Sequence, residues 1–222
     1  MPEVVDWGVR EYRESLDAMR ALVRARRAGT VPDTLILVEH PPVVTVGVEG
    51  DDGSAATSGL PVVQVERGGR ATYHGPGQLV GYPIVDLETR GRDVRQFVHD
   101  VEEVVVRSVG RFGVRAGHVS GRRGVWVDGE RKIASIGIAV DHWVTFHGFA
   151  LNVDPDLDAF GRFHPCGFSG AVMTSLSREL GRAVPISDVV PSVLDAWARV
   201  FGPVRGLATQ AKPTAASPPA HA

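Results

Sequence analysis

Apolar residues recur at helical spacing in three segments of the chain, which we predict to be amphipathic helices. The first runs from Asp6 to Ala28, and Gly29 follows it as a stop signal. Its apolar positions are Trp7, Tyr12, Leu16, Met19 and Val23. The second runs from Asp93 to Phe112, with apolar positions Phe97, Val101, Val105 and Val109. A last helix is expected from Ser187, as its N-cap, to Phe201, with Pro191 near its first turn.

The remaining apolar runs are short and typical of strands. They are Thr34 to Glu39, Val43 to Val46, Val62 to Glu66 and Tyr82 to Leu87, and Asp51 to Gly59 is expected to be a surface loop. A three-stranded meander follows, with strands Gly124 to Val127, Arg131 to Val140 and Trp143 to Val153. Asp128-Gly129, between the first two, is a favoured tight-turn dipeptide.

Antiparallel hairpins without regular strand-helix alternation indicate the α+β class, a mixed α/β domain. At 222 residues we expect one catalytic domain, residues 1–202. From Pro203 onward the chain is mostly Pro, Ala, Thr, Ser and Gln, which is typical of a disordered tail, residues 203–222.

Composition narrows the function classes. A net charge of -2 argues against nucleic acid and against an anionic membrane surface as partners. The chain contains no run of eighteen apolar residues and no basic segment followed by an apolar stretch at its N-terminus, so we expect a cytoplasmic protein. With one cysteine it forms no internal disulfide, and the paired-cysteine spacings of zinc and iron-sulfur sites are missing.

The chain uses arginine 22 times and lysine only twice. Lys212 belongs to the tail, so Lys132 is the only lysine before it, and it lies in an apolar, strand-like run. Lysine can lose its proton when desolvated, whereas arginine cannot. The single cysteine, Cys166, stands in a turn-like His-Pro-Cys-Gly string. Lys132 and Cys166 are therefore a candidate catalytic pair, the alternative being a hairpin-edge cation and an inert buried thiol.

The densest signal is the segment from Arg67 to Pro83, RGGRATYHGPGQLVGYP. Its glycines allow the backbone to approach a ligand closely, and its prolines restrict its path. It lacks the Gly-Lys-Ser/Thr of a P-loop and the G-x-G-x-x-G spacing of a dinucleotide fingerprint. We interpret it as a binding loop, although a pair of tight turns is the simpler alternative.

Two further segments carry chemistry. Phe146 to Val153 is apolar with a central glycine, which fits either a slot for an unbranched chain or a core strand. In Phe163 to Gly170, followed by Met173 to Leu176, the Pro-Cys-Gly turn can expose a thiol and direct backbone N–H groups toward an oxyanion. A cation beside such a thiol increases its thiolate fraction.

Taken together, the Arg67 to Pro83 block, Lys132 to Gly137, His147 to Val153 and Pro165-Cys166-Gly167 resemble the lipoate-protein ligase B family. The resemblance runs from about Thr34 to Leu176 in matching order. His164, Gly170 and Met173 depart from the family pattern and could alter the acyl pocket, but the Lys and Cys positions are intact.

The resemblance implies a largely antiparallel mixed sheet flanked by helices, as in biotinyl/lipoyl protein ligases. It implies transfer of octanoyl from octanoyl-acyl carrier protein to a lysine of lipoyl domains in 2-oxoacid dehydrogenase complexes and the glycine cleavage H protein. Cys166 would be the acyl-thioester nucleophile and Lys132 its acid–base partner, with no cofactor and no metal. The implied substrate-binding residues are Arg67, Gly68, Gly69, Arg70, Ala71, Thr72, Tyr73, His74, Ser135, Ile136, Gly137, Gly148, Phe149 and Ala150.

Three alternative functions remain. An ATP-dependent lipoate or biotin ligase on the same fold would need no cysteine nucleophile, but we find no Gly-Arg-Gly-Arg-type adenylate loop. A cysteine hydrolase would use His74, His147 or His164 as its base. A non-catalytic acyl-binding protein would be indifferent to loss of Cys166.

Overall fold

The computed structural model describes residues 1–163 and 172–209 of the chain. The α-helices in these ranges are α1 (Tyr12–Arg27), α2 (Val94–Gly110), α3 (Leu176–Leu180) and α4 (Ile186–Phe201). The strands are β1 (Glu3–Val9), β2 (Thr34–Glu39), β3 (Val43–Val46), β4 (Val62–Gln64), β5 (Ala71–His74), β6 (Gln78–Ile84), β7 (Ala116–Val119), β8 (Arg122–Val127), β9 (Arg131–Asp141), β10 (Val144–Asn152) and β11 (Arg205–Thr209). Short 3-10 helices lie at Ser54–Thr57, Leu87–Arg90 and Leu157–Arg162.

The strands form two sheets. The larger has eight strands in the order β11-β1-β2-β6-β10-β9-β8-β7, and the smaller has three in the order β4-β3-β5. In the large sheet β1 is parallel to β2 and β11, and the neighbours from β2 to β7 are antiparallel. The prediction of a mixed, largely antiparallel sheet with flanking helices is therefore confirmed.

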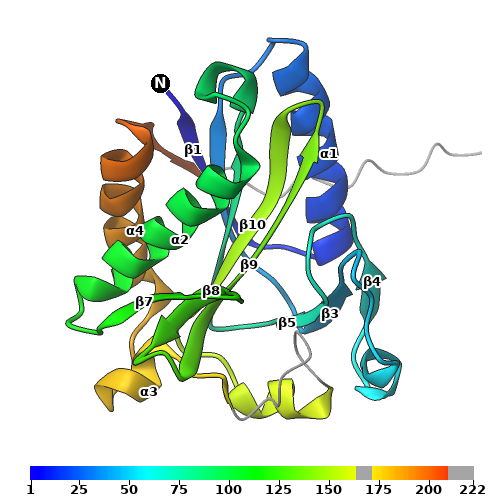
Figure 1. Cartoon of the computed structure of the whole chain (residues 1–222), viewed down its shortest axis with the longest axis vertical. Coiled ribbons are helices and arrows are strands. Elements are labelled where there is room, and N and C mark those ends of the chain that lie inside the picture. The colour runs from blue at the N-terminus through cyan, green and yellow to red at the C-terminus, as the bar shows by residue number, and fades with distance from the viewer. Residues whose placement is uncertain (164–171, 210–222) are drawn as a thin grey trace, which may run out of the picture.

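Helices cover both faces of the large sheet (Figure 1). Helices α2 and α4 lie against each other on one face, and α1 packs on β6 and β10 from the other. The small sheet lies beyond the end of α1, beside the chain that leads into β6 (Figure 1). No helix among the described residues is long and apolar enough to cross a membrane.

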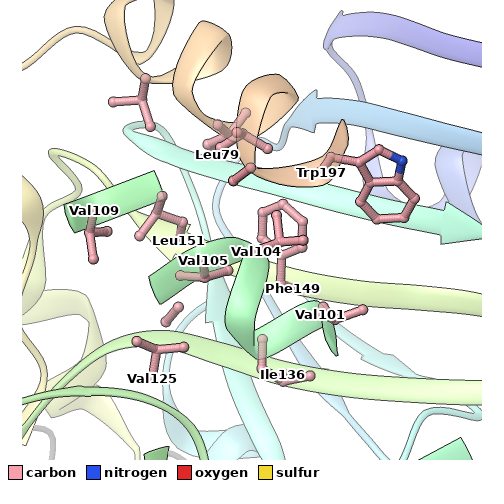
Figure 2. Packing of buried hydrophobic residues seen from close by; sticks show 14 of the residues in the cluster. Leu79, Val101, Val104, Val105, Val109, Val125, Ile136, Phe149, Leu151 and Trp197 are labelled. Atoms are coloured by element: carbon pink, nitrogen blue, oxygen red, sulfur yellow. The ribbon is translucent and has the colours of Figure 1, made fainter. Parts of the chain in front are cut away.

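The central core lies between the large sheet and the α2/α4 pair. Helix α2 contributes a row of valines, and Trp197 of α4 is fully buried beside them. Figure 2 shows Phe149 and Leu151 of β10 pointing into this layer toward α2. Asp93 caps α2 by accepting a hydrogen bond from the N–H of Gln96, which confirms the predicted start of the helix.

The predicted hairpin is also confirmed. Asp128 and Gly129 both have positive φ, 51° and 74°, as a type I′ turn requires, and Glu130 N–H donates to the Val127 carbonyl. The third strand of the meander forms as β10.

Three sequence predictions were wrong at the ends of the chain. The residues before Tyr12 form strand β1 instead of the first turns of a helix, so Trp7 belongs to the sheet. Helix α4 begins at Ile186 after Pro185, so Ser187 is not its N-cap and Pro191 lies beyond the first turn. Arg205–Thr209, which we assigned to the tail, forms β11 and pairs with β1; the rest of the predicted tail lies outside the described residues.

The glycine-dense segment is more regular than predicted. It contains β5 and the start of β6, and β6 ends at Ile84, short of the predicted Leu87. Gly75, between the two strands, has no room for a side chain, because a Cβ there would lie 1.9 Å from the Tyr73 hydroxyl oxygen. The segment therefore forms a tight connection that leads from β5 of the small sheet into β6 of the large sheet.

Candidate active site

One cavity of about 280 Å³ brings the predicted segments together. The predicted residues that line it are Arg67, Gly69, Arg70, Thr72, His74, Lys132, Ser135, Ile136, Gly137, Gly148, Phe149 and Ala150. Residues outside the predicted substrate-binding set also line it, of which Val80 and Tyr82 belong to the predicted binding loop: Tyr12, Glu49, Val80, Tyr82, Gly121, Arg122, Arg123 and His147. The cavity therefore lies where the large sheet, α1 and the small sheet meet.

Strand pairing joins two of the predicted segments residue by residue. In the antiparallel β9–β10 pair, Ser135 is opposite Ala150, Ile136 opposite Phe149, and Gly137 opposite Gly148. Residues opposite each other share a face of a sheet. The two pairs of small residues consequently form one patch without large side chains, on the face away from α2 and α4.

The third predicted segment lies directly on that patch. A Cβ at Gly137 would be 2.8 Å from Arg67 Cδ and 3.0 Å from the Gly68 carbonyl oxygen, so only glycine permits the contact. Gly68 does not line the cavity, but its N–H donates to the Ile138 carbonyl at 3.0 Å, which fastens the loop to β9. Arg67 is buried and donates to the carbonyls of Thr45, Gly68 and Arg70 at 2.8–3.1 Å.

Successive side chains of β5 point to opposite faces, so only every second predicted residue of this strand can face the cavity. Thr72 and His74 face the cavity, whereas Ala71 and Tyr73 pack in a separate apolar cluster with Phe160. Tyr73 and Phe160 meet edge to face with ring centroids 5.3 Å apart. We infer that Ala71 and Tyr73 support the site without lining it.

Ile136 and Phe149 border the cavity from the core. Both belong to the apolar layer under α2 and α4, and Figure 2 shows their side chains there. Phe149 also covers Gly81, where a Cβ would be 2.2 Å from the Phe149 ring. These two residues therefore form a rigid back wall of the cavity.

Lys132 is almost fully buried, with 3% of its surface exposed, and lines the cavity. It lies at a β-bulge: Trp126 pairs with Lys132 and Val125 with Ala134, which leaves Ile133 as the extra residue. Bulges redirect side chains next to functional sites. Lys132 Nζ lies 5.6 Å from the centroid of the Trp126 ring, a cation–π distance that suits a charged lysine in an enclosed position.

The sequence analysis missed a cluster of buried rings beside the cavity. It consists of Tyr12, His40, His74, Tyr82 and His147, with neighbouring ring centroids 5.1–6.5 Å apart. The available signal was the identity of His74, Tyr82 and His147, which lie in segments that the sequence analysis singled out; Tyr12 of α1 and His40, after β2, gave none. Such a cluster requires the tertiary fold.

His147 joins this cluster because its backbone is left-handed, with a φ of 57° inside β10. Strict alternation would place it with Phe149 on the α2 face. Its Nδ1 instead lies 3.4 Å from the Tyr12 hydroxyl of α1, and its ring packs on Phe146. A non-glycine residue in this region is strained, and such strain is concentrated at functional sites.

Burial keeps these rings neutral near pH 7. Burial lowers the pKa of His40 to about 4, and burial followed by the nearby Arg67 charge lowers the pKa of His147 to about 4. The pKa of His74 is also well below its ordinary value, mainly through burial. Burial raises the pKa of Tyr12 to about 12.

The bonds of His40 determine where its proton lies. Its Nδ1 is 2.7 Å from the Arg10 carbonyl oxygen, which can only accept, so Nδ1 carries the proton. Nε2 therefore accepts from the Tyr82 hydroxyl, also at 2.7 Å.

Cys166 and its neighbours Pro165 and Gly167 lie outside the described residues. The same holds for His164 and Gly170, two of the departures from the family pattern; the third, Met173, is buried and bridges to Lys132. Among the described residues, no group of three or more His, Cys, Asp or Glu side chains could hold a metal ion.

Buried His40 predicts a pH dependence of stability. The unfolded chain binds a proton at this histidine near pH 6.5, whereas the folded protein binds it only near pH 4. The free energy of unfolding should therefore fall as the pH is lowered from 6.5 to 4, by up to about 1.4 kcal/mol per pH unit for this one group. Urea unfolding at a series of pH values gives the slope of the unfolding free energy against pH. Between pH 4 and 6.5 this slope should be smaller by that amount in His40→Asn. An unchanged slope in His40→Asn would refute the assignment.

The chain is similar to known proteins over most of its length. Residues 11–198 match the family model of the lipoyl protein ligase A/B catalytic domain. The chain is 46% identical to an octanoyltransferase of Geobacter sulfurreducens, over 95% of this chain and 86% of that protein. It is also 46% identical to an octanoyltransferase of Mycolicibacterium gilvum, over 88% and 84%.

Solved structures share the fold. Lipoate-protein ligase A bound with ATP superposes with a TM-score of 0.77 at 19% identity, over 95% of this chain and 90% of that one. The lipoate protein ligase of the Thermoplasma acidophilum lipoylation system has a TM-score of 0.73 at 17% identity, over 96% and 88%. As the sequence predicted, the chain belongs to the lipoyl protein ligase A/B family, and its relatives place it with the acyltransferases of the lipoate-protein ligase B branch.

Proposed function

We propose that this enzyme transfers the octanoyl group from octanoyl-acyl carrier protein to a specific lysine of lipoyl domains, the first step of endogenous protein lipoylation. The acceptors would be lipoyl domains of 2-oxoacid dehydrogenase complexes and the glycine cleavage H protein. One observation carries the proposal: the buried Lys132 and the three segments that the resemblance assigns to acyl binding surround a single cavity. The names of the relatives support octanoyl as the transferred group.

The cavity has the size and lining for a short acyl chain. Its volume of about 280 Å³ lies just below the range of about 300–1,000 Å³ that is typical of small-ligand pockets. Gly137, Gly148 and Ala150 line it from β9 and β10, and Ile136 and Phe149 line it from the core. An unbranched chain of eight carbons would gain about 0.8 kcal/mol of binding free energy for each methylene that it buries there.

The chemistry follows from a donor that is already activated. The Cys166 thiolate attacks the thioester carbonyl of the donor, the carrier thiolate leaves and takes up a proton, and the octanoyl group is held as a thioester on Cys166. This exchange of one thioester for another is nearly isoenergetic and requires no ATP. The acceptor lysine then attacks the new thioester, an amide bond forms, and the Cys166 thiolate is released.

Lys132 would supply the proton transfers in both steps. As an ammonium it stabilises a nearby thiolate and can protonate the departing carrier thiol. The resulting neutral amine can accept the proton that the acceptor lysine must lose as it attacks.

Charge at the cavity is compatible with an anionic carrier. The cavity-lining arginines Arg70, Arg122 and Arg123 are exposed, and Arg123 forms an ion pair with Glu49. Positive charge of this kind increases the association rate of negatively charged partners.

The proposal is tested by incubating the protein with octanoyl-acyl carrier protein and a lipoyl domain, without ATP or magnesium. We expect intact-protein mass spectrometry to show an octanoylated lipoyl domain, because the thioester supplies the activation. Cys166→Ser should nearly abolish this product, since a serine hydroxyl is a much weaker nucleophile than a thiolate. Product that appears only with free octanoate, ATP and magnesium would instead identify an ATP-dependent ligase.

Lys132→Arg should separate the two half-reactions. Arginine keeps the positive charge, so acylation of Cys166 should continue in part, but it cannot release its proton, so transfer to the acceptor should fall by about 10²–10⁴-fold. Rapid-quench measurement should show acyl-enzyme that accumulates with donor and reacts slowly with the lipoyl domain. Equal loss of both half-reactions would make Lys132 a purely electrostatic residue.

A further inference from the structure

Glu102 is a buried carboxylate on the apolar face of α2. Only 9% of its surface is exposed, and Val101, Val104 and Val105 around it on the helix are fully buried. A charge in such a place is costly unless hydrogen bonds satisfy it. The position therefore requires an explanation that packing alone does not provide.

Both oxygens of this carboxylate are bound, and both partners lie on neighbouring strands. Oε1 accepts from the Gly124 N–H of β8 at 2.8 Å. Oε2 is 2.9 Å from Nδ1 of His118 of β7, whose Nε2 lies 3.7 Å from Glu103. Glu102 thus fastens the end of the large sheet to α2, at one defined backbone position.

That backbone position lies directly against Lys132. Gly124 has a φ of 103°, and a Cβ there would be 2.7 Å from Lys132 Cε and 2.4 Å from the Ala134 carbonyl oxygen. The lysine side chain consequently runs across the bare backbone of Gly124. A shift of β8 at this residue would move the surface on which the lysine rests.

Backbone pairing between β8 and β9 is irregular next to Gly124. The β-bulge between Val125 and Trp126 interrupts regular pairing with β9 at Lys132 and Ala134. Bulges disrupt the backbone hydrogen bonds between strands locally. The Glu102 carboxylate, which accepts from the Gly124 N–H, therefore helps to hold β8 in place. A charged acceptor makes a shorter and stronger bond than a neutral one.

We propose that Glu102 is a positioning residue for Lys132: through Gly124 it holds the backbone of β8 against which the lysine side chain lies. The inference rests on the proposed role of Lys132 in acyl transfer. Glu102 itself touches neither Lys132 nor the acyl group in this account, so its loss should affect catalysis more than substrate binding.

The test compares Glu102→Leu with Glu102→Gln, which retains an oxygen for the Gly124 N–H. Glu103→Leu is the matched control, because it removes the next carboxylate of α2, which pairs with Arg107 and lies near His118, but leaves the Glu102 bond to Gly124 in place. We expect Glu102→Leu to lower kcat for octanoyl transfer by about 10–100-fold, the effect of a misplaced catalytic group, while KM for the donor changes by less than about threefold. Glu102→Gln should recover most of kcat, and Glu103→Leu should match the wild type.

A second measurement reports on the lysine without any acyl substrate. The chain has one cysteine, so the rate of iodoacetamide alkylation against pH reports the Cys166 thiolate alone. If Lys132 stabilises that thiolate, Glu102→Leu should move the midpoint of the profile to higher pH, and Glu102→Gln should leave it in place. A purely structural role of Glu102 would lower the melting temperature without moving this midpoint, and would overturn the inference.

Lys132→Met separates failure of this inference from failure of the proposed function. If Lys132→Met leaves both transfer and the alkylation profile unchanged, the role of Lys132 fails, and the inference fails with it. If Lys132→Met alters them but Glu102→Leu does not, only the inference is overturned. Should Glu102→Leu fail to melt cooperatively, Glu102→Asp replaces it. Its shorter side chain cannot reach Gly124 and His118 together, and wild-type kcat in that variant would contradict the inference.

Discussion

The site depends on the contact between the Arg67 loop and Gly137, where no side chain fits. Because Gly137 has no side chain, the loop approaches β9 closely enough for the Gly68 N–H to donate to the Ile138 carbonyl. Arg67 then extends its guanidinium under the loop to Thr45 of the small sheet. This contact joins the two sheets, and the cavity is the space that remains between them and α1.

Buried polar groups are concentrated on both sides of this cavity. The cluster of His40, His74, His147 and two tyrosines lies toward α1, and Glu102 with Gly124 lies toward α2. Hydrogen bonds hold Glu102 to Gly124 and His40 to Tyr82, and they offset part of the cost of burying these polar groups. Lys132 lies on β9 between these groups, in a position that strand alternation alone would not produce, because the bulge at Ile133 redirects it.

The sequence was informative where structure is local or where glycine is required. Helix α2, strands β2 and β3 and the Asp128-Gly129 turn follow from periodicity and turn chemistry, and the glycine-rich blocks indicated segments that do line one cavity. Non-local effects were missed. Strand β1 was merged into the following helix because its partners, β2 and β11, lie far along the chain. His147 lies on the α1 side of the sheet because its own backbone is left-handed. The pattern of apolar and polar residues does not reveal such a conformation.

The central claim is that close approach at Gly137 builds the acyl site, and Gly137→Ala tests it against Gly117→Ala. A Cβ at Gly137 would collide with Arg67 and Gly68, whereas one at Gly117 of β7 would meet no atom within 4 Å. The measurement is kcat/KM for octanoyl transfer in both variants, on protein whose cooperative thermal unfolding has been verified. We predict a loss of at least about 10-fold for Gly137→Ala, because displacing the loop misplaces the groups around the cavity, and wild-type activity for Gly117→Ala. Wild-type kcat/KM in a folded Gly137→Ala variant would contradict the account.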